Sequence, residues 1–123
     1  MPDPMARLQA RSGAHRLSIR LAASFFSRLR GLLFAPALQP GQGLLIRPCA
    51  AVHTAFMAYP IDVVFLDRAG RVCRIVPGLK PWRAARYTGA YQTLELAAGE
   101  AARIGLRAGQ SLAMGVATEE PRA

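Results

Sequence analysis

The sequence predicts an α+β fold that is predominantly antiparallel β, a compact sandwich or small barrel with two short helices. Several segments alternate apolar and polar residues with the two-residue period of a half-buried strand. Tight, glycine-containing turns separate consecutive segments, whereas parallel strands need crossovers of a dozen or more residues. The chain has 123 residues, of which 52% are hydrophobic. This is the size of one domain with a single adequate core.

The N-terminal part begins with a predicted hairpin. Residues 6–11 and 16–21 alternate in this way, and Ser12-Gly13 between them is typical of a turn. We therefore expect residues 1–15 to form the N-terminal end and first edge strand, residues 16–114 a single compact domain, and residues 115–123 a flexible tail.

Two segments have helical periodicity instead. In residues 23–34 the apolar positions recur on one face of a helix, and a proline follows. Residues 98–104 place Glu100 in the first turn, Arg103 in the last turn and Gly105 at the C-cap, which favours a short helix.

The remaining strands follow from apolar runs between turns. Residues 63–66, Val-Val-Phe-Leu, form an unbroken run, as in a central strand that is buried on both faces. The turn at residues 67–70 leads into residues 71–76 as its hairpin partner. Residues 77–88 are predicted to be a long loop. Further strands are predicted at residues 44–47, 52–57, 91–96 and 111–114.

Several blocks of the chain, in order and spacing, resemble a known family. They are RLRGLLF (28–34), PGQGLL (40–45), HTAFMAYPIDVVFLD (53–67), GRV (70–72), LELAAG (94–99) and ARIGL (102–106), followed by Gly109. Over about residues 16–114 the chain resembles the domain of unknown function family 192, a group of small bacterial and archaeal proteins. The resemblance implies a compact, predominantly β domain with short helices outside it. The family has no established activity, so the resemblance implies no catalytic role.

The chain also departs from the family pattern. Many relatives have Trp-Met-Lys-Asn-Thr before the Pro-x-Asp element, where this chain has His-Thr-Ala-Phe-Met-Ala-Tyr. Many have Gly-Asp near the end, where this chain has Gly109-Gln110. Many members also carry an N-terminal secretion signal. Any site that depends on these patterns is therefore a variant here.

The composition is strongly basic. The formal net charge is +9, and fifteen of the sixteen basic residues are arginine. Such an excess indicates either an anionic partner or a composition bias, and the scatter of the arginines along the chain favours the bias. Arginines interrupt every apolar stretch near the N-terminus, so we expect no membrane span, no targeting peptide and a cytoplasmic location. Cys49 and Cys73 are expected to be buried free thiols.

Residues 52–67 contain several side chains that could take part in catalysis or binding. His53 and Asp62 could act as a general acid–base pair. The simpler interpretation has Asp62 accepting backbone N–H groups and His53 bonded to backbone carbonyls. Thr54, Met57 and Tyr59 either line an apolar pocket or belong to the core and its rim.

Residues 80–87, KPWRAARY, are the most suggestive surface element. An exposed Trp82 flanked by Lys80 and Arg83 can stack on a base, a sugar or an aromatic group while the cations hold a phosphate or carboxylate. The alternative is that Trp82 packs inward and closes one end of the sandwich.

Together these patterns predict a non-enzymatic module that binds an unknown small molecule, peptide or protein, without cofactor or metal. One alternative is a small hydrolase or lyase that uses Asp62 and His53. The other is an arginine-rich binder of nucleic acid or acidic surfaces, of which nucleic acid is the less favoured partner. The predicted binding residues are His53, Thr54, Met57, Tyr59, Asp62, Lys80, Trp82 and Arg83.

Overall fold

The computed structural model describes residues 6–23, 37–55 and 57–116. Most of this part of the chain is extended, and it holds a single short helix. The strands are β1 (Ala6–Ser12), β2 (His15–Ala22), β3 (Gln42–Ile46), β4 (Ala51–His53), β5 (Ile61–Leu66), β6 (Val72–Leu79), β7 (Ala84–Arg86), β8 (Gln92–Ala97) and β9 (Ala113–Val116), and the helix is α2 (Glu100–Arg103).

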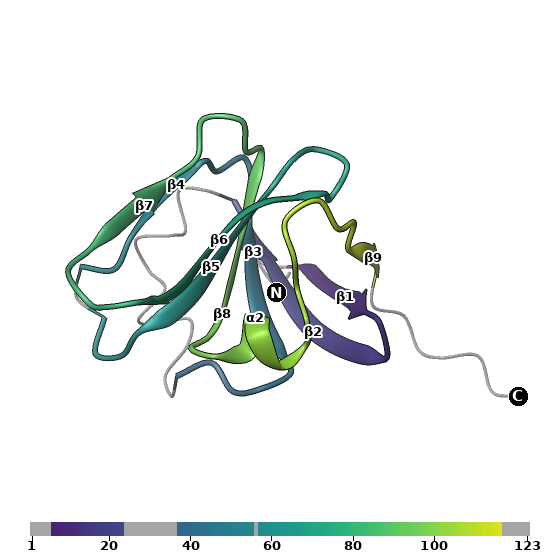
Figure 1. The fold of residues 1–123 in the computed structure, drawn as a ribbon, viewed down its shortest axis with the longest axis horizontal. Coiled ribbons are helices and arrows are strands. Elements are labelled where there is room, and N and C mark those ends of the chain that lie inside the picture. The colour runs from purple at the N-terminus through teal and green to yellow at the C-terminus, as the bar shows by residue number, and fades with distance from the viewer. Residues whose placement is uncertain (1–5, 24–36, 56, 117–123) are drawn as a thin grey trace, which may run out of the picture.

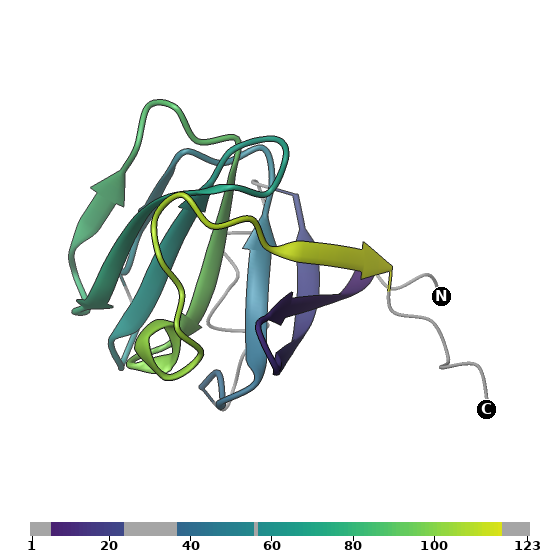
Figure 2. The same cartoon turned by 45° about the vertical axis from the view of Figure 1, so that its right-hand side comes forward.

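Seven strands form one large sheet in the order β6-β5-β8-β3-β2-β1-β9, while β4 and β7 pair as a separate ribbon. The large sheet curls like half of a barrel, with the ribbon at one end and β1 and β9 at the other (Figures 1 and 2). This confirms the predominantly β prediction of a small barrel or sandwich. All neighbouring strands are antiparallel except β2 and β3, which pair in parallel.

The prediction of two short helices is not borne out. The helix predicted at residues 23–34 falls almost entirely on residues outside the described part of the chain. The second helix is only one turn long, because Gly99 before it and Gly105 after it have φ angles of 87° and 72°. Both angles lie in the left-handed region, which suits glycine and ends a right-handed helix.

One loop prediction and three strand predictions were wrong in detail. Half of the loop predicted at residues 77–88 belongs to β6 and β7. Pro77 fits within β6 because β6 is an edge strand, where the missing N–H costs no ladder bond. The first strand is not at the edge, since β9 pairs outside β1, and this final strand lies two residues later than predicted. The strand predicted at residues 52–57 ends at His53.

The central strand β5 is buried along its whole length, as predicted for residues 63–66. Val64 and Leu66 belong to the core cluster that also holds Ile104, beside α2. Val63 and Phe65 belong to a second cluster on the other face, under the ribbon. Because side chains alternate along a strand, β5 separates two apolar layers. No helix in the described residues has the length and apolar character that crossing a membrane requires.

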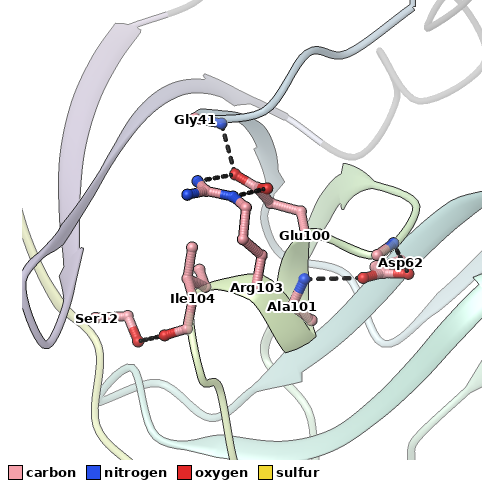
Figure 3. Close-up of polar contacts among 8 residues, drawn as sticks. Ser12, Gly41, Asp62, Glu100, Ala101, Arg103 and Ile104 are labelled. Atoms are coloured by element: carbon pink, nitrogen blue, oxygen red, sulfur yellow. Dashed lines mark hydrogen bonds and ion pairs between the residues drawn. The ribbon is translucent and has the colours of Figure 1, made fainter.

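Asp62 is the one polar residue of β5, and its side chain is 0% exposed. Its Oδ1 accepts the N–H groups of Gly78 at 2.9 Å and Gly99 at 3.1 Å, and its Oδ2 accepts the N–H of Ala101 at 2.9 Å. The carboxylate therefore ties β5 to β6 and to the first turn of α2 (Figure 3). These three backbone donors offset the cost of burying a charged group.

Glu100 links α2 to the turn that precedes β3. Its buried carboxylate pairs with Arg103 at 2.6 and 2.7 Å and accepts the N–H of Gly41 at 2.5 Å (Figure 3). The hydrogen bonds from Arg103 are the largest of the effects that together hold the pKa of Glu100 below its ordinary value of 4.5, and the Gly41 N–H acts in the same direction. The folded state therefore favours the ionised form of this carboxyl.

We expect Asp62→Asn to lower the free energy of unfolding by about 1–3 kcal/mol, because an amide offers one acceptor oxygen and leaves a buried N–H unpaired. Asp67→Asn is the matched control. Asp67 accepts the N–H groups of Ala69 and Arg71 on the same oxygen, Oδ1, which an amide can replace. Its effect should stay within about 0.5 kcal/mol. Urea denaturation followed by circular dichroism measures both, and equal losses would contradict the role of Asp62.

The lowered pKa of Glu100 predicts a pH-dependent contribution to stability. A carboxyl whose pKa is depressed by folding stabilises the folded state above its unfolded pKa, and this contribution is lost as the pH falls through the folded pKa. The difference in unfolding free energy between wild type and Glu100→Gln should therefore be constant above about pH 4.5 and shrink below it. Denaturant titrations from pH 7 to pH 2.5 measure this difference. A difference that does not change with pH would refute the ion pair as its source.

Candidate functional site

The candidate site is built on the β4–β7 ribbon. His53 at the end of β4 lies opposite Ala84 at the start of β7. One residue further on, the N–H of Thr54 donates to the carbonyl of Arg83 at 2.8 Å. This pairing places the His53 segment beside residues 80–83, which we call the tryptophan loop.

Thr54 fixes the backbone of the tryptophan loop from beneath. Its side chain is 0% exposed, and its hydroxyl donates to the carbonyl of Lys80 at 2.6 Å and accepts the N–H of Arg83 at 2.9 Å. Its carbonyl accepts the N–H of Trp82 at 3.1 Å. A buried hydroxyl and carbonyl that are satisfied by one loop hold that loop in a single conformation.

Trp82 points away from the core: 61% of its surface is exposed. Of the two interpretations of the sequence, an exposed Trp82 and a Trp82 that packs inward, the structure has the exposed one, and the indole does not close the end of the sandwich. Its φ of 62° is the only positive value of a non-glycine residue in the part of the chain that is described. For a bulky side chain this conformation is strained, with a typical cost of about 1–3 kcal/mol. The hydrogen bonds to Thr54 hold the backbone in it.

Cationic residues lie close to Trp82 in the chain. Lys80 and Arg83 are both exposed, and the guanidinium of Arg83 donates to the carbonyl of Trp82 at 3.3 Å. His53 is exposed on the ribbon, and its Nδ1 accepts the N–H of Ala55 at 3.3 Å. With Nδ1 accepting, the neutral imidazole carries its proton on Nε2. The four exposed members of the predicted set are therefore His53, Lys80, Trp82 and Arg83.

The structure separates the other predicted residues from this surface. Asp62 points to the α2 side of β5, and its carboxylate oxygens accept hydrogen bonds from three backbone N–H groups. His53 lies on the ribbon, which covers the opposite face of β5, so the predicted acid–base pair of the hydrolase hypothesis does not form. Met57 is buried in the cluster under the ribbon, and the half-buried Tyr59 packs against that cluster. Met57 and Tyr59 therefore belong to the packing under the ribbon, and Asp62 lies on the opposite side of β5.

The His, Cys, Asp and Glu side chains are dispersed over the described part of the chain. Within the described ranges, no three His, Cys, Asp or Glu residues are grouped closely enough to hold a metal ion. Cys49 and Cys73 are free thiols, only half-buried where burial was expected. Each donates to a nearby carbonyl, Cys49 to Ala51 at 3.1 Å and Cys73 to Arg71 at 3.6 Å.

A groove next to the tryptophan loop was not anticipated from the sequence. It has a volume of about 410 Å³ and lies between β6 and the ribbon, with Val52, Val76 and the alanines of β7 among its lining residues. Arg74 and Arg86 supply its charge, and the guanidinium of Arg74 donates to the carbonyl of Arg86 at 3.0 Å. The alanines of β7 form part of the apolar wall, and the sequence pattern had assigned these residues to a loop.

The fold has counterparts among solved structures. A protein of unknown function from Novosphingobium aromaticivorans DSM 12444 superposes with a TM-score of 0.72, covering 89% of this chain and 84% of that chain at 22% identity. A protein from Sinorhizobium meliloti 1021, described as a candidate transcription regulator, superposes with a TM-score of 0.74, covering 89% of this chain and 93% of that chain at 22% identity. At this identity the likeness concerns the fold alone.

Two curated archaeal proteins are similar in sequence. A UPF0127 protein of Thermococcus sibiricus is 33% identical over 69 residues, which are 53% of this chain and 44% of that protein. UPF0127 protein PH1112 of Pyrococcus horikoshii is 39% identical over 71 residues, which are 53% of this chain and 58% of that protein. The match thus spans about half the length of each relative. The model of the family DUF192, described as uncharacterized ACR, matches residues 7–114. The chain therefore belongs to the domain of unknown function family 192, as its sequence blocks had indicated.

Proposed function

We propose that this protein is a non-enzymatic binding module whose recognition surface consists of His53, Lys80, Trp82 and Arg83 with the adjoining groove. The observation that carries the proposal is the conformation of Trp82. A large apolar side chain is held in solvent by a backbone that is itself strained, and buried hydrogen bonds maintain that strain. Strain and exposure together are typical of a residue kept for contact with a ligand.

The charges around the indole define the class of ligand. Lys80 and Arg83 flank Trp82, and Arg74 and Arg86 border the groove beside it. Guanidinium groups bind carboxylate and phosphate with two parallel hydrogen bonds. The indole face and the apolar groove wall favour a flat or apolar group. The preferred ligand is therefore an anion joined to a ring or apolar chain.

Binding is favoured over the hydrolase alternative by the state of Asp62. A general acid or base must reach the proton it transfers, and this carboxylate is enclosed by backbone donors. His53 then remains as a polar contact at the edge of the recognition surface.

Trp82 is the only tryptophan of the chain, so its fluorescence reports directly on this surface. We expect phenyl phosphate to quench it in a saturable manner, because the probe supplies both a ring and a dianion. Benzamide, which keeps the ring, and inorganic phosphate, which keeps the charge, should each bind at least tenfold more weakly.

The matched variant is Trp82→Gly, because glycine accepts a φ of 62° without strain and should preserve the fold. Loss of aromatic stacking should weaken phenyl phosphate binding about tenfold or more in isothermal titration calorimetry. Arg107→Gln, an exposed position at a distant turn, is the charge control and should bind as wild type does. Unchanged fluorescence with all three probes, together with equal affinities for wild type and Trp82→Gly, would overturn the proposal.

A further inference from the structure

The outer edge of β6, the edge that faces away from β5, adjoins the groove beside the ribbon. β6 is the last strand in the order of the large sheet, so no strand of the described residues pairs with this edge. An edge strand presents a row of N–H and C=O groups that can pair with another chain. Arg74 and Val76 of β6 also line the groove of about 410 Å³. The backbone edge and the groove are therefore continuous.

The part of this edge that can accept another strand is short. At the start of β6, the N–H of Val72 donates to the carbonyl of Gln110 at 2.7 Å, and its carbonyl accepts the N–H of Gly109 at 2.7 Å. Toward the other end, Pro77 has no N–H to offer. Residues 73–76 lie between these limits and span about 13 Å. Because alternate residues direct their backbone groups to the same edge, two of these four can pair with an added strand.

The side chains at this edge offer one charged and one apolar contact. Arg74 and Val76 are two residues apart on β6, and both lie on the face of the sheet that the ribbon covers. Arg74 is exposed and uses one N–H to donate to the carbonyl of Arg86 at 3.0 Å, while the rest of its guanidinium carries further donors. Val76 is half-buried and packs against the core cluster under the ribbon.

The groove combines positive charge with a wall of small apolar side chains. Arg74 and Arg86 are its charged lining residues, and its other lining residues are alanines and valines. Every Asp and Glu in the described ranges is buried or half-buried, so no exposed carboxylate of this part of the chain competes for the groove. An acidic side chain on a partner is therefore the complementary group.

We propose that β6 and the groove bind an extended acidic peptide segment of a partner protein, which adds a strand at residues 73–76. The peptide carries an acidic side chain opposite Arg74 and, two positions away, an apolar side chain opposite Val76 that enters the groove. In such strand addition, main-chain hydrogen bonds provide affinity, and pockets for alternate side chains provide specificity. The inference names a partner for the groove and rests in that respect on the proposed function.

Other occupants fit this surface less well. A second copy of the chain would bring its own Arg74 to the same short edge, and like charges on paired strands repel. Nucleic acid has no main chain that matches the N–H and C=O groups of a strand, and a small organic anion leaves those groups to water. An acidic extended peptide satisfies the edge, the charge and the groove together.

The test uses the full chain and a fluorescein-labelled peptide, Thr-Val-Thr-Glu-Thr-Val-Thr with blocked ends, with binding followed by anisotropy. The peptide is symmetric, so either strand direction places a valine two positions from the glutamate. Replacing its glutamate by glutamine should weaken binding about fivefold, because the charge pair with Arg74 is lost. N-methylation of its central residues, which removes the main-chain donors, should weaken binding about tenfold or more.

Arg74→Gln should bind the glutamate peptide about fivefold more weakly than wild type does and should bind the glutamate and glutamine peptides equally. Arg74→Lys keeps the charge and should bind the glutamate peptide nearly as wild type does. Arg107→Gln, exposed and outside β6, is the charge-matched control and should leave binding unchanged. By NMR, saturating peptide should slow amide exchange at least tenfold within residues 73–76, and the N-methylated peptide should not.

Three results would overturn the inference. They are the absence of binding at about 1 mM peptide, equal affinities of Arg74→Gln and Arg107→Gln for the glutamate peptide, and a dimer of this chain that protects residues 73–76 without peptide. If phenyl phosphate still quenches Trp82 in any of these cases, the proposed function stands and only the peptide partner is wrong. If phenyl phosphate and the peptide both fail to bind, both proposals are wrong.

Discussion

The candidate site depends on the buried hydroxyl of Thr54. The strand β4 ends at His53, and the N–H of Thr54 makes the last hydrogen bond between this segment and the β7 side of the ribbon, to the carbonyl of Arg83. The hydroxyl and carbonyl of Thr54 bind Lys80, Trp82 and Arg83 through backbone groups alone. These contacts fix the tryptophan loop through its backbone, while the side chains of Lys80, Trp82 and Arg83 are exposed. A free hydroxyl at this depth would cost about 1–3 kcal/mol, so the loop conformation and the satisfaction of Thr54 are one constraint.

Asp62 plays the corresponding part on the other side of β5. Both residues are buried polar groups that bind backbone rather than side chains, and each joins segments that are distant in the sequence. The strand β5, which contains Asp62, supplies alternate residues to both core clusters. The pattern from His53 to Asp67 thus reflects two structural anchors around a central strand. The residues available for recognition are the exposed ones of the tryptophan loop, Lys80, Trp82 and Arg83.

Local patterns predicted the β5–β6 hairpin well. An unbroken apolar run, a turn with glycine at a φ of 87° and an alternating return strand are all contiguous in the chain. The same patterns missed β7, because three small or charged residues become a strand only through pairing with β4 some thirty residues earlier. The parallel β2–β3 pair was missed for a similar reason, since its register depends on contacts across a long connection.

The sites were less predictable than the fold. Local patterns predicted a strand at residues 71–76, but only the order of the sheet reveals that β6 is an edge strand. The neighbouring Lys80 and Arg83 indicated that Trp82 could be a binding residue. Its exposure, however, depends on a backbone angle that no local pattern encodes. Asp62 and His53 are nine residues apart and looked like partners. They are separated because the side chain of Asp62 points from one face of β5 while His53 lies on the ribbon that covers the other face.

Amide hydrogen exchange at Trp82 tests the constraint by Thr54 most directly. The N–H of Trp82 belongs to an exposed residue and donates to the carbonyl of Thr54. In wild type and in Thr54→Ser, which keeps the hydroxyl, NMR should show slow exchange of this amide. In Thr54→Val, which keeps the shape and removes the hydroxyl, exchange should accelerate by at least tenfold while the amides of β5 stay protected. Equal exchange rates in Thr54→Ser and Thr54→Val would contradict the account.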